Sequence, residues 1–231
     1  MSYKIELHLH TKGNSACAHV NYIDIIKEYK EKGYSGIVCT NHLNETAWSY
    51  LKGFTNKTKH KSFLKGFDDL YLEAKKNGIK VYFGMELALK GEDYKGLREN
   101  CVELLIYGIE RKEFEIYSNS LYSMCHKEIF DLANEKGWVI IQAHPFRPRT
   151  RLENNYVHGA ECINTHFKHK NNNNLAIEYV KNNNYIGTCG SDYHENGMAI
   201  SYIEVETMPE NEKSLAQMLK NNNFKLFEYK E

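Results

Sequence analysis

The chain has 231 residues, and its 30 basic and 30 acidic side chains leave no formal net charge. This balance argues against a globally basic nucleic-acid-binding protein. Hydrophobic residues make up 42% of the chain and charged residues 26%, a globular composition that excludes a disordered chain. No apolar run reaches the roughly 18 residues of a transmembrane helix, and no apolar signal region opens the sequence, so we expect a soluble cytoplasmic protein.

The six cysteines are expected to be reduced. None of them forms a CxxC pair, and most lie in apolar, strand-like contexts. In a chain of this size without an export signal, buried free thiols are expected rather than a disulfide framework. No linker divides the chain, so we expect a single domain over residues 1–231.

A repeated pattern predicts the strands in chain order. Amphipathic stretches end in Lys-Gly, Asn-Gly or Asn-rich junctions, where Gly and Asn tolerate the left-handed conformation that closes a helix. Short apolar runs follow these junctions and are rich in β-branched and aromatic residues, as buried parallel strands are. The predicted strands span residues 4–10, 35–40, 79–84, 102–107, 138–143, 159–163, 185–190, 199–205 and 224–227.

Helices are predicted between these strands from apolar residues spaced three and four apart. Their apolar faces lie within residues 22–29, 64–74, 124–133 and 175–180, and Asn21 is placed to cap the first of them. Alternating strands and helices predict crossover units and a mainly parallel sheet. About seven or eight such units in this length predict a compressed barrel or an open sheet.

Histidine and acidic residues follow several of the predicted strands. They are His8, His10, His42, Glu86, His144, Asp192 and His194. In parallel α/β architectures the carboxyl ends of the strands meet at one face, and ligands bind there. Five different strands therefore deliver an imidazole or a carboxylate to the same face, and in combination these residues predict a metal site.

The spacing of the residues supports a metal site. His8 and His10 are two positions apart, so on a strand both side chains point to one side. Leu7 and Leu9 are then expected on the opposite face. Imidazole and carboxylate ligands together suit Zn²⁺, Mn²⁺ or Fe²⁺ better than Mg²⁺ or Ca²⁺. Because six or more ligands exceed the need of one ion, we expect two or three ions.

The motifs resemble those of the PHP family, named for polymerase and histidinol phosphatase. The matching stretches occur in the family's order, and they are Glu6-Leu7-His8-Leu9-His10-Thr11, Thr40-Asn41-His42, Gly84-Met85-Glu86, Ala143-His144-Pro145-Phe146-Arg147 and Gly190-Ser191-Asp192-Tyr193-His194. The resemblance implies a distorted, TIM-like (β/α) barrel of seven strands with two or three metal ions at the strand ends. It also implies hydrolysis of a phosphoester, with phosphate bridging the metals.

The chain departs from the family pattern in three places. Asn41 stands where the family usually has Asp, which keeps a hydrogen-bonding carbonyl but loses the charge. Many members carry a further histidine where we align Leu105. The family's Ser-Asp-Gly is replaced by a segment that contains Cys17 and His19, and both are candidates for the missing ligand. A two-metal and a three-metal site are therefore both compatible with the sequence.

Hydrolysis of a phosphate ester needs a hydroxide nucleophile and cations that neutralise the phosphoryl oxygens, and bound metal ions supply both. We expect Glu86 to be the catalytic carboxylate that bridges the ions. The loop after His144 carries Arg147 and Arg149, whose planar guanidinium groups are candidates for phosphate binding. Of the two, Arg147 is the preferred candidate. Lys12, just beyond the first motif, is a candidate of the same kind.

Two further residues belong to the strand at 159–163 or follow it. His166 is a candidate substrate contact or proton donor to the leaving oxygen, or else a surface histidine. Glu161 is a candidate partner of the metal ligands. Both assignments depend on that strand ending at the same face as the others.

The leading hypothesis is a metal-dependent phosphoesterase acting on a small phosphorylated substrate such as histidinol phosphate or a nucleotide. Oligonucleotide ends stay open, whereas zero net charge disfavours long nucleic acid, and no membrane partner is expected. An amidohydrolase-type metal hydrolase is an alternative, because that class also begins with HxH on a first strand. A non-catalytic barrel that binds a ligand is another, which the residues at Asn41 and Leu105 favour. The sequence does not fix the oligomeric state.

Overall fold

The computed structural model describes residues 2–15, 17–51, 55–93, 99–121 and 123–227 as a mixed α/β fold. The strands are β1 (Tyr3–Leu9), β2 (Gly36–Cys39), β3 (His42–Leu43), β4 (Lys80–Phe83), β5 (Met85–Leu87), β6 (Leu104–Tyr107), β7 (Val139–Gln142), β8 (Gly159–Asn164), β9 (Ile186–Gly190), β10 (Ile203–Val205) and β11 (Lys225–Leu226). The helices are α1 (Tyr22–Glu31), α2 (Glu45–Tyr50), α3 (Asn56–Lys76), α4 (Arg111–Leu121), α5 (His126–Lys136), α6 (Asn173–Asn183) and α7 (Glu212–Lys220). Each predicted strand is found with shifted ends, whereas β3 and β5 were not predicted.

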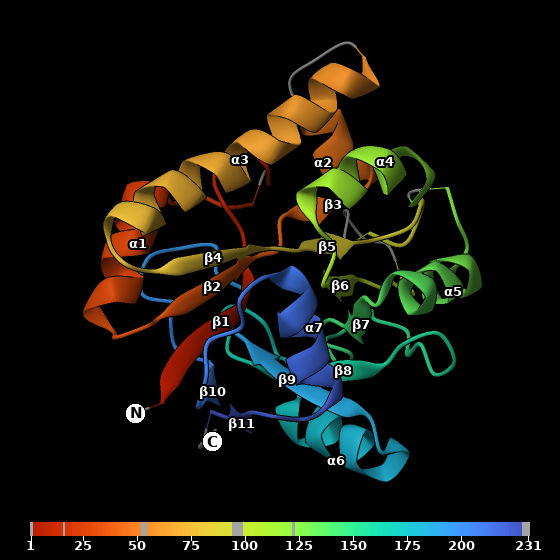
Figure 1. Ribbon diagram of the computed structural model, residues 1–231. Coiled ribbons are helices and arrows are strands. Elements are labelled where there is room, and N and C mark those ends of the chain that lie inside the picture. The colour runs from red at the N-terminus through yellow and green to blue at the C-terminus, as the bar shows by residue number, and fades with distance from the viewer. Residues whose placement is uncertain (1, 16, 52–54, 94–98, 122, 228–231) are drawn as a thin grey trace.

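The described strands pair as two sheets (Figure 1). One sheet has the order β11-β10-β1-β2-β4 and the other the order β3-β5-β6-β7-β8-β9. The chain passes from the first sheet to the second twice, from β2 to β3 and from β4 to β5. Beyond β1 and β9, the amide of His10 donates to the carbonyl of Tyr193 (3.1 Å), which brings these strand ends together. A closed barrel is not shown by this pairing.

The expectation of a mainly parallel arrangement is wrong for β6. This strand runs antiparallel to both of its neighbours, β5 and β7, and pairs Leu104 with Leu87. No helix is described between β5 and β6, so the chain reverses direction without the crossover that a parallel pair requires. The edge strands β10 and β11 are antiparallel as well. As a result, the amino end of β6 lies where its neighbour β5 has its carboxyl end.

The expectation that Leu7 and Leu9 lie on the same face of β1 is wrong, because β1 contains a β-bulge. Glu6 pairs with Ile37 and Leu9 with Cys39, so two residues of β1 stand opposite one residue of β2. Leu9 packs in the apolar cluster beneath α1 and α3, whereas Leu7 packs in a second cluster with residues of α7. Bulges change the direction of side chains next to functional sites. Because of this bulge, the side chains around Leu7 and His8 do not alternate between the two faces as in a regular strand.

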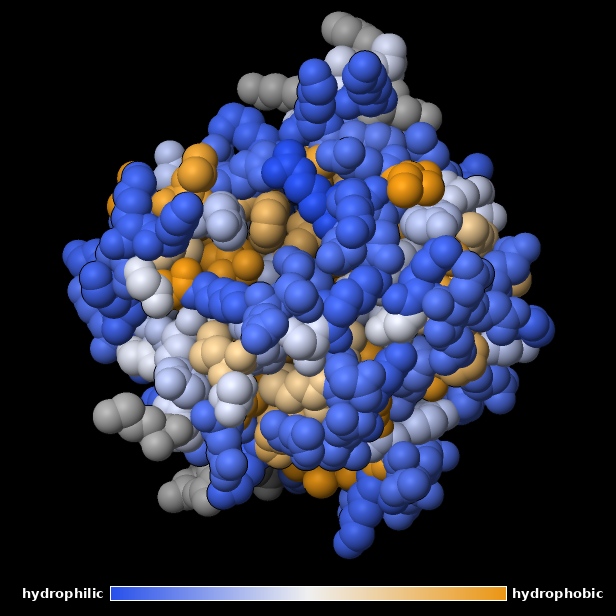
Figure 2. Space-filling view, viewed as in Figure 1, coloured by the Kyte–Doolittle hydropathy of each residue, from blue (hydrophilic) through white to orange (hydrophobic). Residues whose placement is uncertain are grey.

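Helices cover the outer faces of the sheets. Asn21 caps α1 as predicted, because its side chain accepts from the amides of Ile23 and Asp24. Helices α1 and α3 lie side by side over the first sheet, and α6 packs on β8 and β9 (Figure 1). Figure 2 shows polar and charged side chains over most of one face, with apolar groups between them. Within the described part of the chain, none of the helices has both the length and the apolar character of a membrane span.

Candidate metal centre

The two histidines of the first motif lie at the centre of a buried polar cluster. The Nε2 atoms of His8 and His10 are 3.0 Å apart, and both side chains are almost fully buried. The prediction that both point to the same place is therefore seen in the structure. Oδ1 of Asp192, from the loop after β9, lies 3.5 Å from Nε2 of His8 and 3.3 Å from Nε2 of His10.

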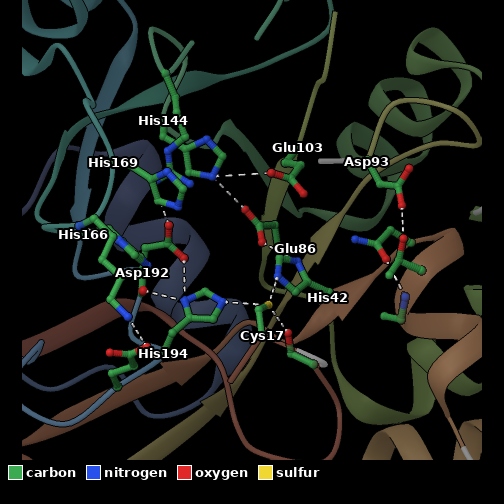
Figure 3. A pocket seen from close by; sticks show the side chains of 17 residues that line it. Cys17, His42, Glu86, Asp93, Glu103, His144, His166, His169, Asp192 and His194 are labelled. Atoms are coloured by element: carbon green, nitrogen blue, oxygen red, sulfur yellow. Dashed lines mark hydrogen bonds and ion pairs between the residues drawn. The ribbon is translucent and has the colours of Figure 1, made fainter. Parts of the chain in front are cut away.

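Glu86 on β5 contacts imidazoles from three other segments of the chain, and Figure 3 draws two of them, His42 and His144. Its Oε1 lies 3.4 Å from His8 Nε2 and 3.2 Å from His144 Nε2. Its Oε2 lies 3.4 Å from His10 Nε2 and 2.7 Å from His42 Nδ1. Glu86 is 1% exposed, so bulk water does not screen these contacts. One carboxylate thus touches four histidines.

Two residues of the cluster have unusual backbone conformations. His144 and Asp192 have φ angles of 29° and 50°, in the left-handed region that side chains other than glycine rarely adopt. Such strain concentrates at functional sites, where the surrounding structure imposes it. Here it directs His144, after β7, and Asp192, after β9, toward the same cluster.

The cluster forms one wall of a pocket of about 390 Å³. Glu103 also lines this pocket, with Oε2 3.6 Å from His144 Nε2, although sequence reasoning did not identify it. The alignment placed Leu105 at a ligand position, but Leu105 is fully buried in the apolar cluster beneath α7. Because β6 is antiparallel, its amino end faces the pocket, and Glu103 immediately precedes that end.

A second layer of hydrogen bonds orients the cluster. Oε1 of Glu161 on β8 lies 2.9 Å from Nδ1 of His8, and its Oε2 accepts from the amide of His144 at 3.0 Å. Oε1 of Glu6 accepts from the amides of His8 (2.9 Å) and Ser191 (3.0 Å), which ties the bulge of β1 to the loop that carries Asp192. Burial raises the pKa of Glu6 to about 7, although the hydrogen bonds from Ser191 oppose the rise.

The side chain of Asn41 hydrogen-bonds to Thr11, the residue that follows His10. Its Oδ1 accepts from the amide of Thr11 (2.8 Å), and its Nδ2 donates to the hydroxyl of Thr11 (2.9 Å). The amide thus fixes the chain just after His10. Since both the oxygen and the nitrogen of the amide are used, an asparagine suits this position.

The charges in the cluster act on one another strongly. Burial alone would raise the pKa of Glu86, but His42 and His8 outweigh it and hold this pKa well below the usual range. Burial, together with the nearby charges of His42 and His194, holds the pKa of His10 well below its usual value. Burial and then the charge of Glu86 raise the pKa of Glu103 to about 8. These directions favour an anionic Glu86 and a neutral His10, which are the forms that bind cations. Burial opposes the charged forms of His8, His42 and His194, but neighbouring acidic groups outweigh it and raise the pKa of these three rings.

Arg147 lies in the wall of the pocket beside Asp192. Its Nη2 donates to Oδ2 of Asp192 (2.7 Å) and to Oδ1 of Asn164 (3.2 Å), and its Nε donates to Oδ1 of Asn171 (3.1 Å). The side chain is 6% exposed. A guanidinium has more N–H donors than these three contacts use, so Arg147 keeps donors for a further anion.

The other predicted residues lie in different places. His166 and His194 line the pocket, with ring centroids 5.5 Å apart. Lys12 and His19 are exposed, and neither they nor Arg149 are among the residues that line the pocket. His19 also belongs to none of the potential ligand groups found among the described residues.

Cys17 lies at the pocket, although the sequence offered it only as an alternative to His19. Its Sγ is 3.1 Å from Nε2 of His194 and 3.5 Å from Nε2 of His42. Burial would raise the pKa of this thiol, but the charges of His42 and His194 outweigh it and lower the pKa to about 5.

The donor atoms of the cluster fit divalent cations. The described residues contain four overlapping groups of three potential ligands, and within each group the ligand atoms lie within 4.8 Å of one another. The groups are His8–His10–Glu86, His10–His42–His194, His166–Asp192–His194 and His42–Glu86–Glu103. Nδ1 of His10 is buried and has no hydrogen-bond partner in the described part of the chain. Buried carboxylates and imidazoles are costly unless they are paired or coordinate a metal. Imidazole with carboxylate is a donor set of Zn²⁺, Mn²⁺ and Fe²⁺.

Comparison with known proteins agrees with this geometry. Residues 6–182 match the model of the PHP domain. The chain belongs to the PHP domain family. The match ends before Asp192 and His194, which the fold brings next to His8 and His10.

Several known proteins are similar to this PHP domain. Over 175 residues it is 28% identical to a DNA polymerase III PolC-type of Latilactobacillus sakei, a match that covers 68% of this chain but only 10% of the polymerase. A two-domain protein from Bacteroides vulgatus that contains a predicted PHP-like metal-dependent phosphoesterase superposes with a TM-score of 0.61 at 15% identity, covering 98% of this chain and 65% of that one. The lesion-specific endonuclease PfuEndoQ from Pyrococcus furiosus superposes with a TM-score of 0.54 at 16% identity, covering 98% of this chain and 58% of the endonuclease. At these identities the two superpositions show a shared fold.

Proposed function

We propose that this PHP domain is a metal-dependent phosphoesterase that hydrolyses a small phosphorylated substrate. One observation carries the proposal: Glu86 and Asp192 meet the ring nitrogens of His8 and His10 within 3.5 Å, beside the guanidinium of Arg147. The cluster supplies cation ligands, and the guanidinium supplies donors for a phosphate. Glu86, Asp192 and Arg147 line the same pocket.

The proposed cation ligands come from segments that are far apart in the sequence. They are His8, His10, His42, Glu86, Glu103, His144, Asp192 and His194, and they would hold two or three divalent ions. Bound ions would supply an activated water and neutralise charge on the phosphate. His19 is not included, because it is exposed and does not line the pocket.

The chain's own residues would contribute to the reaction in three ways. Glu161 accepts from Nδ1 of His8, which leaves Nε2 of that ring to face the cluster. Arg147 would bind a phosphate oxygen with its remaining N–H groups while Asn164 and Asn171 fix the guanidinium. His166, at the pocket wall, would contact the substrate or donate a proton to the leaving oxygen.

The size of the pocket favours a small substrate. A volume of about 390 Å³ matches a metabolite-sized ligand such as a sugar phosphate, histidinol phosphate or a nucleotide. Asn44, Thr46 and Asp93 also line the pocket, where they would contact the body of the substrate. Figure 3 shows Asp93 on the opposite side of the site from His166 and Asp192. We further propose that strands from both sheets form a distorted barrel of the PHP type.

One observation favours the end of an oligonucleotide as a second candidate substrate. Phe167 is 61% exposed and directly precedes Lys168 and His169, which line the pocket. An exposed aromatic ring can stack on a base while the ammonium group of Lys168 contacts a phosphate. The same cation site would then hydrolyse a phosphodiester.

An activity panel tests the proposal. The metal-depleted protein is reloaded with Mn²⁺, Zn²⁺ or Fe²⁺ and assayed on phosphomonoesters, phosphodiesters and short single-stranded oligonucleotides. We expect metal-dependent release of phosphate from a monoester, and loss of that release in His10→Ala and Asp192→Ala proteins that remain folded. Release of mononucleotides alone would favour the second candidate. Hydrolysis of amides or lactones without phosphoester hydrolysis would favour an amidohydrolase, and no turnover with bound metal would favour a binding protein.

A further inference from the structure

The thiol of Cys17 faces two histidines of the candidate metal centre. Sγ lies 3.1 Å from Nε2 of His194 and 3.5 Å from Nε2 of His42, and 2.6 Å from the hydroxyl of Ser15 (Figure 3). Cys17 belongs to the loop between β1 and α1, and the residue as a whole is exposed. The sulfur nevertheless points into the pocket, which Cys17 helps to line.

The tautomer of His194 makes Nε2 its ligand atom. Nδ1 of His194 lies 2.8 Å from the backbone carbonyl oxygen of Asp192. A carbonyl oxygen only accepts, so Nδ1 keeps its proton and Nε2 is the nitrogen that can bind a cation. Nε2 is also the nitrogen that faces the sulfur of Cys17.

A third imidazole lies against this pair. The ring of His10 stacks on those of His42 and His194 at centroid distances of 4.2 and 4.4 Å. The three histidines each offer a ring nitrogen within 4.8 Å of the others. His10 is 1% exposed, and its Nδ1 has no hydrogen-bond partner among the described residues. The sulfur of Cys17 lies beside two of these three histidines, His42 and His194.

We propose that Cys17 is a thiolate ligand, and that with His42 and His194 it binds one divalent cation of the centre. A sulfur ligand selects thiophilic ions, so this position favours Zn²⁺ or Cd²⁺ over Mn²⁺. The inference deepens the proposed function, because it concerns one ion of the same centre. It also assigns the ligand that the sequence left open between His19 and Cys17.

Thiol alkylation tests whether metal covers the sulfur. Cys125 is the matched internal control, since it and Cys17 are the two exposed cysteines among the described residues. Iodoacetamide labelling is followed by peptide mass spectrometry on metal-free and Zn²⁺-loaded protein. We expect Zn²⁺ to protect Cys17 and to leave the labelling of Cys125 unchanged. Equal labelling of Cys17 in both states would overturn the proposal.

Cobalt spectroscopy tests the bond itself. Metal-free wild-type, Cys17→Ser and Cys125→Ser proteins are loaded with Co²⁺, and the near-ultraviolet sulfur-to-cobalt charge-transfer band is recorded. We expect the band in the wild type and in Cys125→Ser, and its complete loss in Cys17→Ser, whose visible cobalt bands persist through the histidine ligands. A band that survives in Cys17→Ser, or is absent from the wild type, would overturn the thiolate ligand.

The two proposals can fail separately. Wild-type protein that hydrolyses a phosphoester with Mn²⁺ but shows no charge-transfer band would retain the proposed function and reject Cys17 as a ligand. Protein that shows the band but hydrolyses no phosphoester would retain Cys17 as a ligand and reject the proposed function. Measured affinities give a third readout, because Cys17→Ser should weaken Cd²⁺ and Zn²⁺ binding more than Mn²⁺ binding.

Discussion

Oε1 of Glu161, on β8, lies 2.9 Å from Nδ1 of His8, on β1. Both side chains are buried, and the carboxylate also accepts from the amide of His144 and from Nδ2 of Asn164. Carboxylates of this kind fix the tautomer of a metal-binding histidine and raise its basicity. Glu161 is therefore a positioning residue for two of the proposed ligands.

Replacing this carboxylate should weaken metal binding. We expect Glu161→Gln to lower the affinity for Zn²⁺ or Mn²⁺ by roughly 10- to 100-fold, because the amide is a poorer partner for Nδ1 of His8. Titration against a chelator of known affinity measures the change. Glu206→Gln, at an exposed position, is the matched control and should leave the affinity unaltered. Wild-type affinity in Glu161→Gln would show that the contact has no role in the site.

Gly190 at the end of β9 leaves room for His8. A Cβ atom at this position would overlap Cβ of His8 and lie 2.5 Å from Oε1 of Glu161. We expect Gly190→Ala to displace His8 and to reduce metal content measured by elemental analysis.

Gly187→Ala, on the same strand, is the control for Gly190→Ala. Its Cβ would meet Cγ1 of Val180 at 3.0 Å and Sγ of Cys162 at 3.1 Å, away from the centre. This variant should lose about 1–3 kcal/mol of stability by overpacking but keep its metal. Loss of metal in both variants would mean that the effect is a general one on folding.

Arg147 should act on substrate affinity. We expect Arg147→Ala to raise KM for a phosphorylated substrate about 10- to 100-fold, since a hydrogen bond to a charged group contributes roughly 1.5–3 kcal/mol. Arg149→Ala should leave KM near the wild-type value, because Arg149 is not among the residues that line the pocket. Steady-state kinetics at saturating metal make the comparison. An unchanged KM in Arg147→Ala would remove this residue from the phosphate site.

His158 should make stability fall in mild acid. Nδ1 of this ring accepts from the amide of Ile140 at 3.0 Å, which only an unprotonated nitrogen can do. Burial, with the charge of Lys220, lowers the pKa of His158 from 6.5 to about 4. The contribution is complete above the unfolded pKa of 6.5 and is lost as the pH falls from there toward 4. Because the ring is partly exposed, we expect about 1–2 kcal/mol.

Urea unfolding at several pH values measures this contribution. His158→Asn keeps an acceptor for the amide of Ile140 but does not titrate, so its stability should depend less on pH between 6.5 and 4. His19→Asn, at an exposed position, should keep the wild-type profile. An identical slope in His158→Asn and the wild type would contradict the assignment.

Sequence reasoning located the cluster because its ligands follow parallel strands. The order of His8, His10, Glu86, His144 and Asp192 along the chain fixes which strand ends carry them, and strand ends of one direction meet at one face. Their contacts in the fold follow from that topology alone. Local spacing predicted that His8 and His10 meet, although the bulge in β1 breaks the strict alternation on which that prediction relied.

Where the chain departs from parallel pairing, sequence reasoning failed. Glu103 was missed because β6 is antiparallel, which turns the beginning of this strand toward the pocket instead of its end. Leu7 was misplaced because the bulge in β1 depends on pairing with β2, a contact distant in sequence. The choice between Cys17 and His19 needed the path of a loop that carries no periodic pattern.

Anomalous X-ray diffraction on crystals loaded with Mn²⁺ or Zn²⁺ tests the central claim most directly. The account predicts strong peaks within the cluster of His8, His10, Glu86 and Asp192, at bonding distance from their nitrogen and oxygen atoms. A map without anomalous peaks at this cluster, in crystals whose ions are bound elsewhere or not at all, would contradict it.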